Sequence, residues 1–434
     1  MKIKMVSALE ILDSRGNPTI ASTVVLEDGS TGWAAVPSGA STGKYEAVEL
    51  RDGDERRYAG QGVLKAVENV NTKIAGTITG MNAEEQEKID QKMIEVDGTK
   101  NKANLGANAI LSVSLAVARA EALAEKKPLY QYLTKFNPNH KEPYIMPIPQ
   151  MNIMNGAKHA NWATDIQEYM ILPIAVGSEH EAIRMCSEIY HQLKRELKAV
   201  GYALTVGDEG GYAPRLQSNE EPFQRIQQAV EQAGYTFGKD IFLAVDAAAS
   251  EFYQDQMYHL NKEGKIYTSE ELLNFYQLLI QKYPIVSVED PFDQDDWQGF
   301  KKINQLKGNK IQIVGDDLFV TNTERLKIGI TEKATNSILI KLNQIGTLTE
   351  TVQTILLARQ NKMTSVVSHR SGETEDPFIA DFTVGMGVGQ IKTGAPARGE
   401  RTAKYNRLIA IEKELGEKAV YAEFPFFNPG MTSL

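Results

Sequence analysis

The sequence predicts an α/β protein in which a smaller α+β domain precedes a (β/α) barrel. The chain has 434 residues, and single hydrophobic cores stop growing near ~250–300 residues, so at least two domains are expected. Short strands and then helices fill the first part, whereas short apolar runs alternate with helical patterns in the second. These two patterns predict an N-terminal domain over residues 1–137 and a C-terminal barrel over residues 138–434.

The N-terminal strands are predicted from segments rich in Ile, Val and Thr. Turn residues separate them at 15–18 and 27–29, and short strands joined by tight turns predict an antiparallel meander. The clearest helix follows over 105–124, where large apolar residues recur among alanines. The predicted strands are 3–10, 18–27 and 30–36.

Four prolines lie close together at Pro138, Pro143, Pro147 and Pro149. Because proline extends neither a helix nor a central strand ladder, this segment is the predicted domain boundary.

The barrel is predicted from six short apolar runs. Continuous β-branched runs indicate strands that are buried on both faces, hence a parallel sheet with crossover helices. At least six such units over roughly 200 residues favour a barrel over an open sheet. The runs are 241–245, 285–288, 311–314, 337–340, 364–367 and 389–391.

Each run ends at a titratable residue, and an earlier run at 203–206 leads into Glu209. One such residue is usually a solvated strand end or a helix cap. Seven together predict an active site, because the strand ends of a parallel barrel converge on one face. The six residues at the runs are Asp246, Glu289, Asp316, Lys341, His369 and Lys392.

The carboxylates of Asp246, Glu289 and Asp316 would repel one another unless a cation neutralises them. Oxygen ligands without Cys or His indicate a hard ion, Mg²⁺ or else Mn²⁺. Lys341 and Lys392 lie near this site, and a lysine beside other cations can act as a neutral base near pH 7. The residues therefore predict metal-dependent proton abstraction from an anionic substrate.

Arg370 and Ser371 follow the run at 364–367 and offer a planar fork and a hydroxyl suited to phosphate. In isolation the segment 368–376 is better explained as a polar loop. His159, between 151–156 and Gln167, is left open between a site residue and an ordinary loop residue.

Composition excludes several classes of function. Lys and Arg number 47 and Asp and Glu 56, which gives a formal charge of −9 and argues against general binding to nucleic acid or anionic membranes. The single cysteine, Cys186, fits a reducing compartment. With no leader or membrane-length apolar run expected, the chain is predicted to be cytoplasmic.

Taken together, the motifs identify the chain as similar to the enolases over essentially its whole length. This resemblance implies an N-terminal α+β capping domain on a (β/α)₈-type barrel with an irregular ββαα(βα)₆ start. It also implies reversible dehydration of 2-phosphoglycerate to phosphoenolpyruvate, in a homodimer or an octamer of dimers. The matching segments are 13–19, 37–43, 155–159, 167–168, 207–211, 245–246, 288–292, 315–318, 340–347, 368–376 and 389–394.

The resemblance implies two Mg²⁺ ions in each active site. Asp246, Glu289 and Asp316 would bind the first, which would hold the substrate carboxylate. Ser41, on a loop flanked by glycines, would bring the second together with the phosphate.

The resemblance also implies the roles of the other residues. Lys341 would remove the C2 proton, and Glu209 would protonate the departing C3 hydroxyl with support from Glu168. The remaining implied contacts are Lys392 with the carboxylate, Arg370 and Ser371 with the phosphate, and Gln167, His159 and His369 as pocket residues.

Two alternatives remain open at this stage. One is a related enolate-forming barrel enzyme that acts on a phosphonate or another carboxylate. The other is a surface role in plasminogen binding through lysines, which the absence of a lysine from the end of the sequence, 430–434, disfavours.

Overall fold

The computed structural model describes residues 1–40 and 43–426. It begins with an antiparallel sheet in the order β1-β2-β3, which confirms the predicted meander. The first turn is fixed by Asp13, whose Oδ1 accepts hydrogen bonds from the backbone N–H of Arg15 at 2.8 Å and of Asn17 at 2.9 Å. The strands are β1 (Ile3–Leu12), β2 (Pro18–Leu26) and β3 (Thr31–Ala35).

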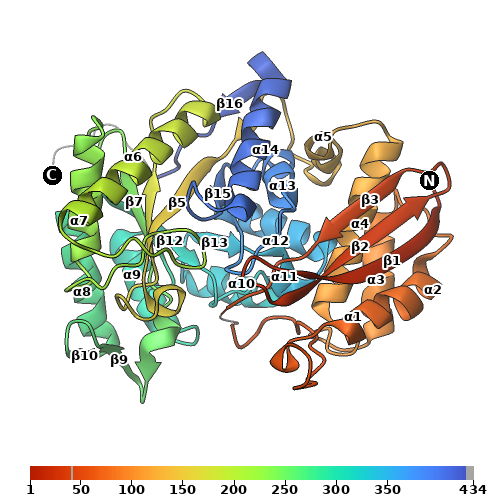
Figure 1. Ribbon diagram of the computed structural model, residues 1–434, viewed down its shortest axis with the longest axis horizontal. Helices are drawn as coiled ribbons and strands as arrows, with labels where there is room; N and C mark the ends of the chain where they lie inside the picture. The colour runs from red at the N-terminus through yellow and green to blue at the C-terminus, as the bar shows by residue number, and fades with distance from the viewer. Residues whose placement is uncertain (41–42, 427–434) are drawn as a thin grey trace.

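Helices cover one face of this sheet, and Figure 1 shows them beside the red strands at the N-terminal end of the molecule. The helix α4 packs on β2 and β3 and is buried along most of its length. Among the described residues, only α4 has the length and the mean hydropathy, 1.3, to cross a membrane; 83% of it is buried, as in a core helix. The helices are α1 (Leu64–Asn69), α2 (Ala75–Ile78), α3 (Gln86–Asp97), α4 (Ala107–Ala124) and α5 (Leu129–Leu133).

The contact between β3 and α4 depends on Gly32. A Cβ atom at this position would lie 2.0 Å from the carbonyl oxygen of Ala116 and 2.4 Å from the backbone nitrogen of Ala120. We expect Gly32→Ala to lower the free energy of unfolding by about 1–3 kcal/mol or more, because the helix must move away from the sheet. Thermal and urea unfolding would measure the loss.

Gly76 on α2 provides the matched control, since a Cβ atom there would meet nothing within 4 Å. Gly76→Ala should leave stability unchanged or raise it by up to about 1 kcal/mol, because alanine is the better helix former. Equal stability of the two variants would show that the sheet and α4 are not packed as described.

Eight strands close into a barrel in the order β11-β12-β13-β14-β15-β5-β6-β7. All neighbouring pairs are parallel except those of β6, which runs antiparallel to both β5 and β7. This confirms the barrel and the irregular start that the resemblance implied. The strands are β5 (Ile148–Asn155), β6 (Glu168–Leu172), β7 (Phe242–Asp246), β11 (Ile285–Glu289), β12 (Gln312–Gly315), β13 (Ser337–Ile340), β14 (Thr364–Ser368) and β15 (Gln390–Lys392).

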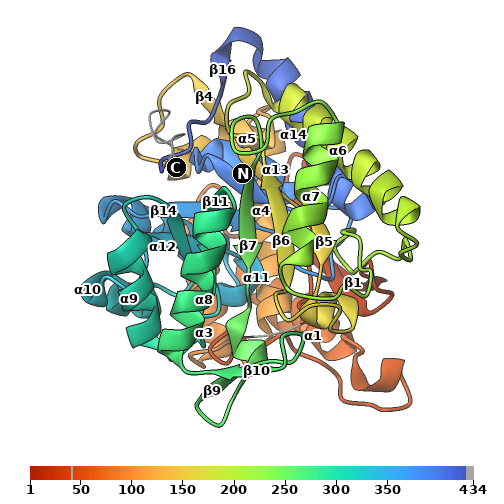
Figure 2. The same ribbon diagram turned by 90° about the vertical axis from the view of Figure 1, so that its left-hand side faces the viewer.

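Helices follow the strands in the order ββαα(βα)₆ and lie outside the barrel, where Figure 2 shows α6 to α9 around the strands. Smaller sheets pair β4 (Tyr144–Met146) with β16 (Ala419–Tyr421) and join β8 (Tyr253–Gln254), β9 (Met257–Leu260) and β10 (Lys265–Tyr267). The helices are α6 (Glu179–Ala199), α7 (Glu221–Gln232), α8 (Ser269–Lys282), α9 (Trp297–Lys307), α10 (Thr323–Glu332), α11 (Leu342–Ile345), α12 (Leu348–Gln360), α13 (Phe378–Met386) and α14 (Gly399–Leu415).

Two local expectations were wrong. The run at 203–206 is not a strand, and its one ladder contact is an isolated bridge from Val206 to Tyr212. Pro149, expected in a linker, lies inside the barrel strand β5. It is tolerated because the pairing of β5 with β6 begins only at Met151, so the missing N–H of Pro149 precedes that ladder.

Candidate active site

The predicted site residues meet at the carboxyl ends of the barrel strands. Asp246, Glu289 and Lys392 are the last residues of β7, β11 and β15. One cavity at this end collects most of the predicted set. Its lining includes His159, Gln167, Glu168, Glu209, Asp246, Asp316, Lys341, His369, Arg370, Ser371 and Lys392.

Lys392 is the central cation of the buried acidic cluster. Its Nζ lies 3.0 Å from Asp246 Oδ2, 3.0 Å from Glu289 Oε2 and 3.2 Å from Glu168 Oε1. Burial would lower the pKa of Lys392, but the charges of Asp246 and Glu168 outweigh it and hold the pKa well above its ordinary value. Burial, and then the charge of Asp246, raises the pKa of Glu289. The cluster therefore carries more acid groups than its lysine can neutralise.

Lys341 directly follows β13, and its Nζ pairs with Asp316 Oδ2 at 2.5 Å. The other oxygen of Asp316, Oδ1, accepts a hydrogen bond from Gln344 Nε2 at 2.8 Å. Burial alone would lower the pKa of Lys341, but the Asp316 carboxylate reverses this and raises it. The close pairing with Asp316 therefore favours the charged form of Lys341 over the neutral form that a base requires.

Two further carboxylates, Asp290 and Asp317, line the cavity although the sequence analysis missed them. Asp290 accepts hydrogen bonds from the backbone N–H of Asp316 at 2.8 Å and of Asp317 at 2.7 Å. Burial and then the charge of Asp316 raise the pKa of Asp317 to about 8. The doubled acidic pairs 289–290 and 316–317 were the signal that could have revealed them.

The donor chemistry at this end fits a divalent cation. Oxygens of Asp290, Asp316 and Asp317 lie within 4.8 Å of one another, and Asp246 and Glu289 are buried on the adjacent strands. Buried carboxylates in excess over cations are the ligands that Mg²⁺ and Mn²⁺ take in proteins. The structure thus groups Asp316 with Asp290 and Asp317, as well as with the two carboxylates that the sequence indicated.

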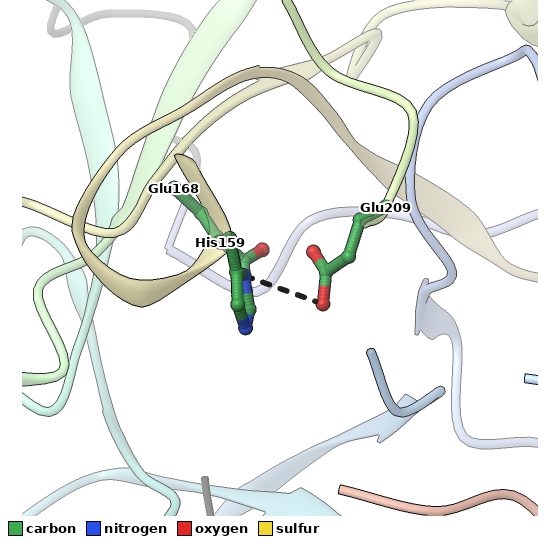
Figure 3. A group of neighbouring side chains, drawn as sticks. All are labelled: His159, Glu168 and Glu209. Atoms are coloured by element: carbon green, nitrogen blue, oxygen red, sulfur yellow. Dashed lines mark ion pairs between the residues drawn. The ribbon is translucent and has the colours of Figure 1, made fainter. Parts of the chain in front are cut away.

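A second group of titratable side chains faces the cavity from β6 and two loops. Figure 3 shows His159, Glu168 and Glu209 together, with a carboxyl oxygen of Glu209 facing the histidine ring. His159 Nδ1 lies 3.6 Å from Glu209 Oε1 and 3.9 Å from Glu168 Oε1. Glu209 comes from a loop, because the run before it is not a strand. It nevertheless reaches the predicted place, where Asn152 Nδ2 donates to its Oε2 at 2.9 Å.

The two carboxyl groups have pKa values that are displaced in opposite directions. Burial, and then the charge of Glu209, raises the pKa of Glu168 well above its ordinary value. Burial would also raise the pKa of Glu209, but the His369 and His159 rings reverse this and hold it well below. Burial lowers the pKa of His369 to about 4 and lowers that of His159. Of the two carboxyl groups, Glu168 is therefore the one that more readily keeps a proton.

Arg370 and Ser371 form the remaining wall. The Arg370 guanidinium donates to both carboxylate oxygens of Glu46, at 2.9 Å and 3.2 Å, and to Asn343 Oδ1 at 3.1 Å. Glu46, which the sequence analysis did not single out, thereby fixes the plane of the guanidinium.

Ser41 lies outside the described residues, but residues on both sides of it contact the site. The backbone N–H of Ala40 donates to Ser371 Oγ at 2.8 Å. A Cβ atom at Gly43 would lie 2.9 Å from Asp317 Oδ1. The loop after β3 therefore approaches the cavity at the predicted phosphate wall.

Comparison with protein families agrees with this geometry. Residues 3–133 match the family model described as the enolase N-terminal domain. Residues 143–429 match the model described as the enolase C-terminal TIM barrel domain. The second match alone covers more than half of the chain, which therefore belongs to the enolase family.

Proposed function

We propose that this lyase-type enzyme of the enolase superfamily catalyses the Mg²⁺-dependent, reversible dehydration of 2-phosphoglycerate to phosphoenolpyruvate. The observation that carries the proposal is the arrangement of one cavity. Lys341 beside Asp316, the close carboxyl groups of Glu168 and Glu209, and the Arg370–Ser371 pair all line it. These groups supply a base, an acid and a phosphate site for a single small substrate.

The cation would be held by Asp246, Glu289 and Asp316, with Ser41 bringing a second one next to the substrate phosphate. A bound divalent cation would supply positive charge that stabilises the second negative charge formed when the carbon beside a carboxylate loses its proton. Lys392, which already faces three carboxylates, would hold the substrate carboxylate from the other side.

Lys341 would act as the base that removes the C2 proton. It can do so only after it has lost its own proton, and its pairing with Asp316 opposes that loss. Any contact that draws the Asp316 carboxylate away from Lys341 lowers the pKa of the lysine and so favours the basic form. Asp316 would thus set the pKa of Lys341 as well as carry negative charge.

Glu168 and Glu209 would deliver a proton to the C3 hydroxyl as it leaves. Two carboxyl groups this close do not both ionise readily, so the pair retains a proton at neutral pH. In the reverse direction the ionised member of the pair would accept a proton from the attacking water, as microscopic reversibility requires.

Arg370 is expected to determine phosphate binding. We expect Arg370→Lys to lower kcat/KM about 10–100-fold. A lysine has a single ammonium group, so it cannot pair with Glu46 and also give the phosphate the two parallel hydrogen bonds of a guanidinium. Steady-state kinetics and competition by inorganic phosphate would measure the loss.

Arg359→Lys is a matched control, because Arg359 is a partly buried arginine bonded to Asn137 Oδ1 at 2.8 Å and to Met386 O at 2.7 Å, outside the residues that line the cavity. Its kcat/KM should equal that of the wild type. An unchanged kcat/KM in Arg370→Lys would remove Arg370 from the phosphate site.

The proposed reaction is tested by the ultraviolet absorbance of the enol product after addition of 2-phosphoglycerate and Mg²⁺. The absorbance should rise with 2-phosphoglycerate and stay flat with unphosphorylated glycerate. A phosphonate or another carboxylate that reacts faster than 2-phosphoglycerate would favour the alternative of a related enolate-forming enzyme.

A further inference from the structure

Arg401, in the first turn of α14, is the largest fully buried side chain among the described residues. Its Nη1 donates to His369 Nδ1 at 2.7 Å and to the Arg370 carbonyl oxygen at 2.6 Å. Its Nη2 donates to the carbonyl oxygens of Ser371 at 2.6 Å and of Asp208 at 3.1 Å. One guanidinium therefore ties the loop of Arg370 and Ser371 to the loop that carries Glu209.

The contact with His369 determines where the ring carries its proton. A guanidinium only donates hydrogen bonds, so His369 Nδ1 must be the acceptor. The neutral ring then carries its hydrogen on Nε2, which lies 3.4 Å from Glu209 Oε1. The Nε2–H therefore faces Glu209 Oε1, but it makes no hydrogen bond to that oxygen in this structure. Asn152 donates to the other oxygen of the same carboxylate.

The alternative tautomer would reverse this arrangement. A hydrogen on Nδ1 would point at the Arg401 guanidinium, and the lone pair on Nε2 would then face the negative charge of Glu209. Both contacts would become repulsive, so the buried guanidinium selects one of the two tautomers.

We propose that Arg401 is a positioning residue that holds His369 in the Nε2–H tautomer and thereby orients the Glu209 carboxylate beside Glu168, the partner with which it would deliver a proton to the leaving hydroxyl. The kinetic part of this inference rests on the proposed function, whereas the tautomer does not. Lys341 is held by a different contact, its ion pair with Asp316. Loss of Arg401 should therefore affect departure of the C3 hydroxyl more than removal of the C2 proton.

Two variants of Arg401 separate positioning from folding. Arg401→Met removes all donors, and Arg401→Lys keeps the charge and one donor group. We expect Arg401→Met to lower the dehydration rate by ~10–100-fold, the usual effect of losing an orienting partner. Arg401→Lys should recover part of that loss, and exchange of the C2 hydrogen with D₂O should fall less than dehydration in both variants.

Arg407→Met is the control on the same helix. Arg407 donates to Asp381 at 2.8 Å and 2.7 Å, so its loss also removes a paired arginine from α14. It should lower the melting temperature without changing the ratio of dehydration to exchange. An Arg401 variant with the same ratio as wild type would overturn the kinetic part of the proposal, whichever of the two variants folds.

Nitrogen-15 NMR of the imidazole rings tests the tautomer independently of the reaction, with His369→Asn used to assign the signals. Wild type should show His369 protonated at Nε2 only, and Arg401→Met should show protonation at Nδ1 as well. Protonation at Nδ1 in the wild type would overturn the proposal. If the wild type did not dehydrate 2-phosphoglycerate, the proposed function would fail while this spectrum still decided the role of Arg401.

Discussion

Replacing Asp246, Glu289 or Asp316 with alanine is expected to lower the dehydration rate roughly 10²–10³-fold, and excess chelator is expected to abolish it in the wild type. The physical reason is the charge of the intermediate, because loss of the C2 proton places a second negative charge beside a carboxylate. Lys392 alone cannot balance that charge, since it already faces three buried carboxylates.

The prediction needs a measurement that separates metal loss from loss of an ion pair. Calorimetric titration with Mg²⁺ in the absence of substrate should show weakened binding in all three variants. Glu87→Ala removes an exposed carboxylate on α3 and should change neither binding nor rate. Full turnover in excess chelator would refute the metal requirement, and normal Mg²⁺ binding by Asp316→Ala would assign the loss of rate to the unpaired Lys341.

The sequence predicted the strand ends well because they depend on local patterns. Each apolar run of the barrel is followed within two residues by its titratable residue, so barrel geometry alone brings Asp246, Glu289 and Lys392 together. The antiparallel strand β6 came only from the resemblance, since an apolar run does not show the direction of its neighbours. Glu209 reached its expected place although the strand predicted before it does not exist.

Contacts between residues far apart in the chain could not be predicted from the sequence. Glu46 meets Arg370, and Arg401 meets His369 and the carbonyl of Asp208, from elements that no periodicity connects. The charge state of a side chain likewise depends on contacts with residues that are distant in the sequence. The two lysines suggested a neutral base, but the pKa of Lys341 depends more on its single contact with Asp316 than on Lys392.

The second large effect that we expect is that replacing the base and replacing the acid stop different steps of the reaction. Lys341→Ala should abolish exchange of the C2 hydrogen of 2-phosphoglycerate with D₂O, and dehydration with it, because Lys341 is the proposed base. Glu209→Gln should retain measurable exchange and lose dehydration, because proton removal at C2 needs no acid at C3. Proton NMR of the substrate in D₂O measures both rates in one sample.

The dependence on pH follows from the same two roles. Lys341 must lose a proton to act, so the rate should rise as the pH approaches its raised pKa. The Glu168–Glu209 pair must keep one proton, so the rate should fall as the pH passes the raised pKa of Glu168. The wild-type rate should therefore be bell-shaped in pH. Glu168→Gln should lower the dehydration rate and move the alkaline limb to lower pH, because the amide supplies no acid proton and the pKa of the remaining carboxyl group, Glu209, is held well below its ordinary value.

The two proposed roles are separable because Lys341 and Glu209 line one cavity but are held by different contacts. Lys341 follows β13 and pairs with Asp316, whereas Glu209 is held by Asn152 and faces His369. Under the proposed function, a bound substrate would present C2 to Lys341 and the C3 hydroxyl to Glu209. If Lys341→Ala still exchanged the C2 hydrogen and Glu209→Gln did not, the base would be the carboxyl pair. Lys341 would then be left to stabilise charge, and the direction of proton flow through the cavity would be the reverse of the one proposed.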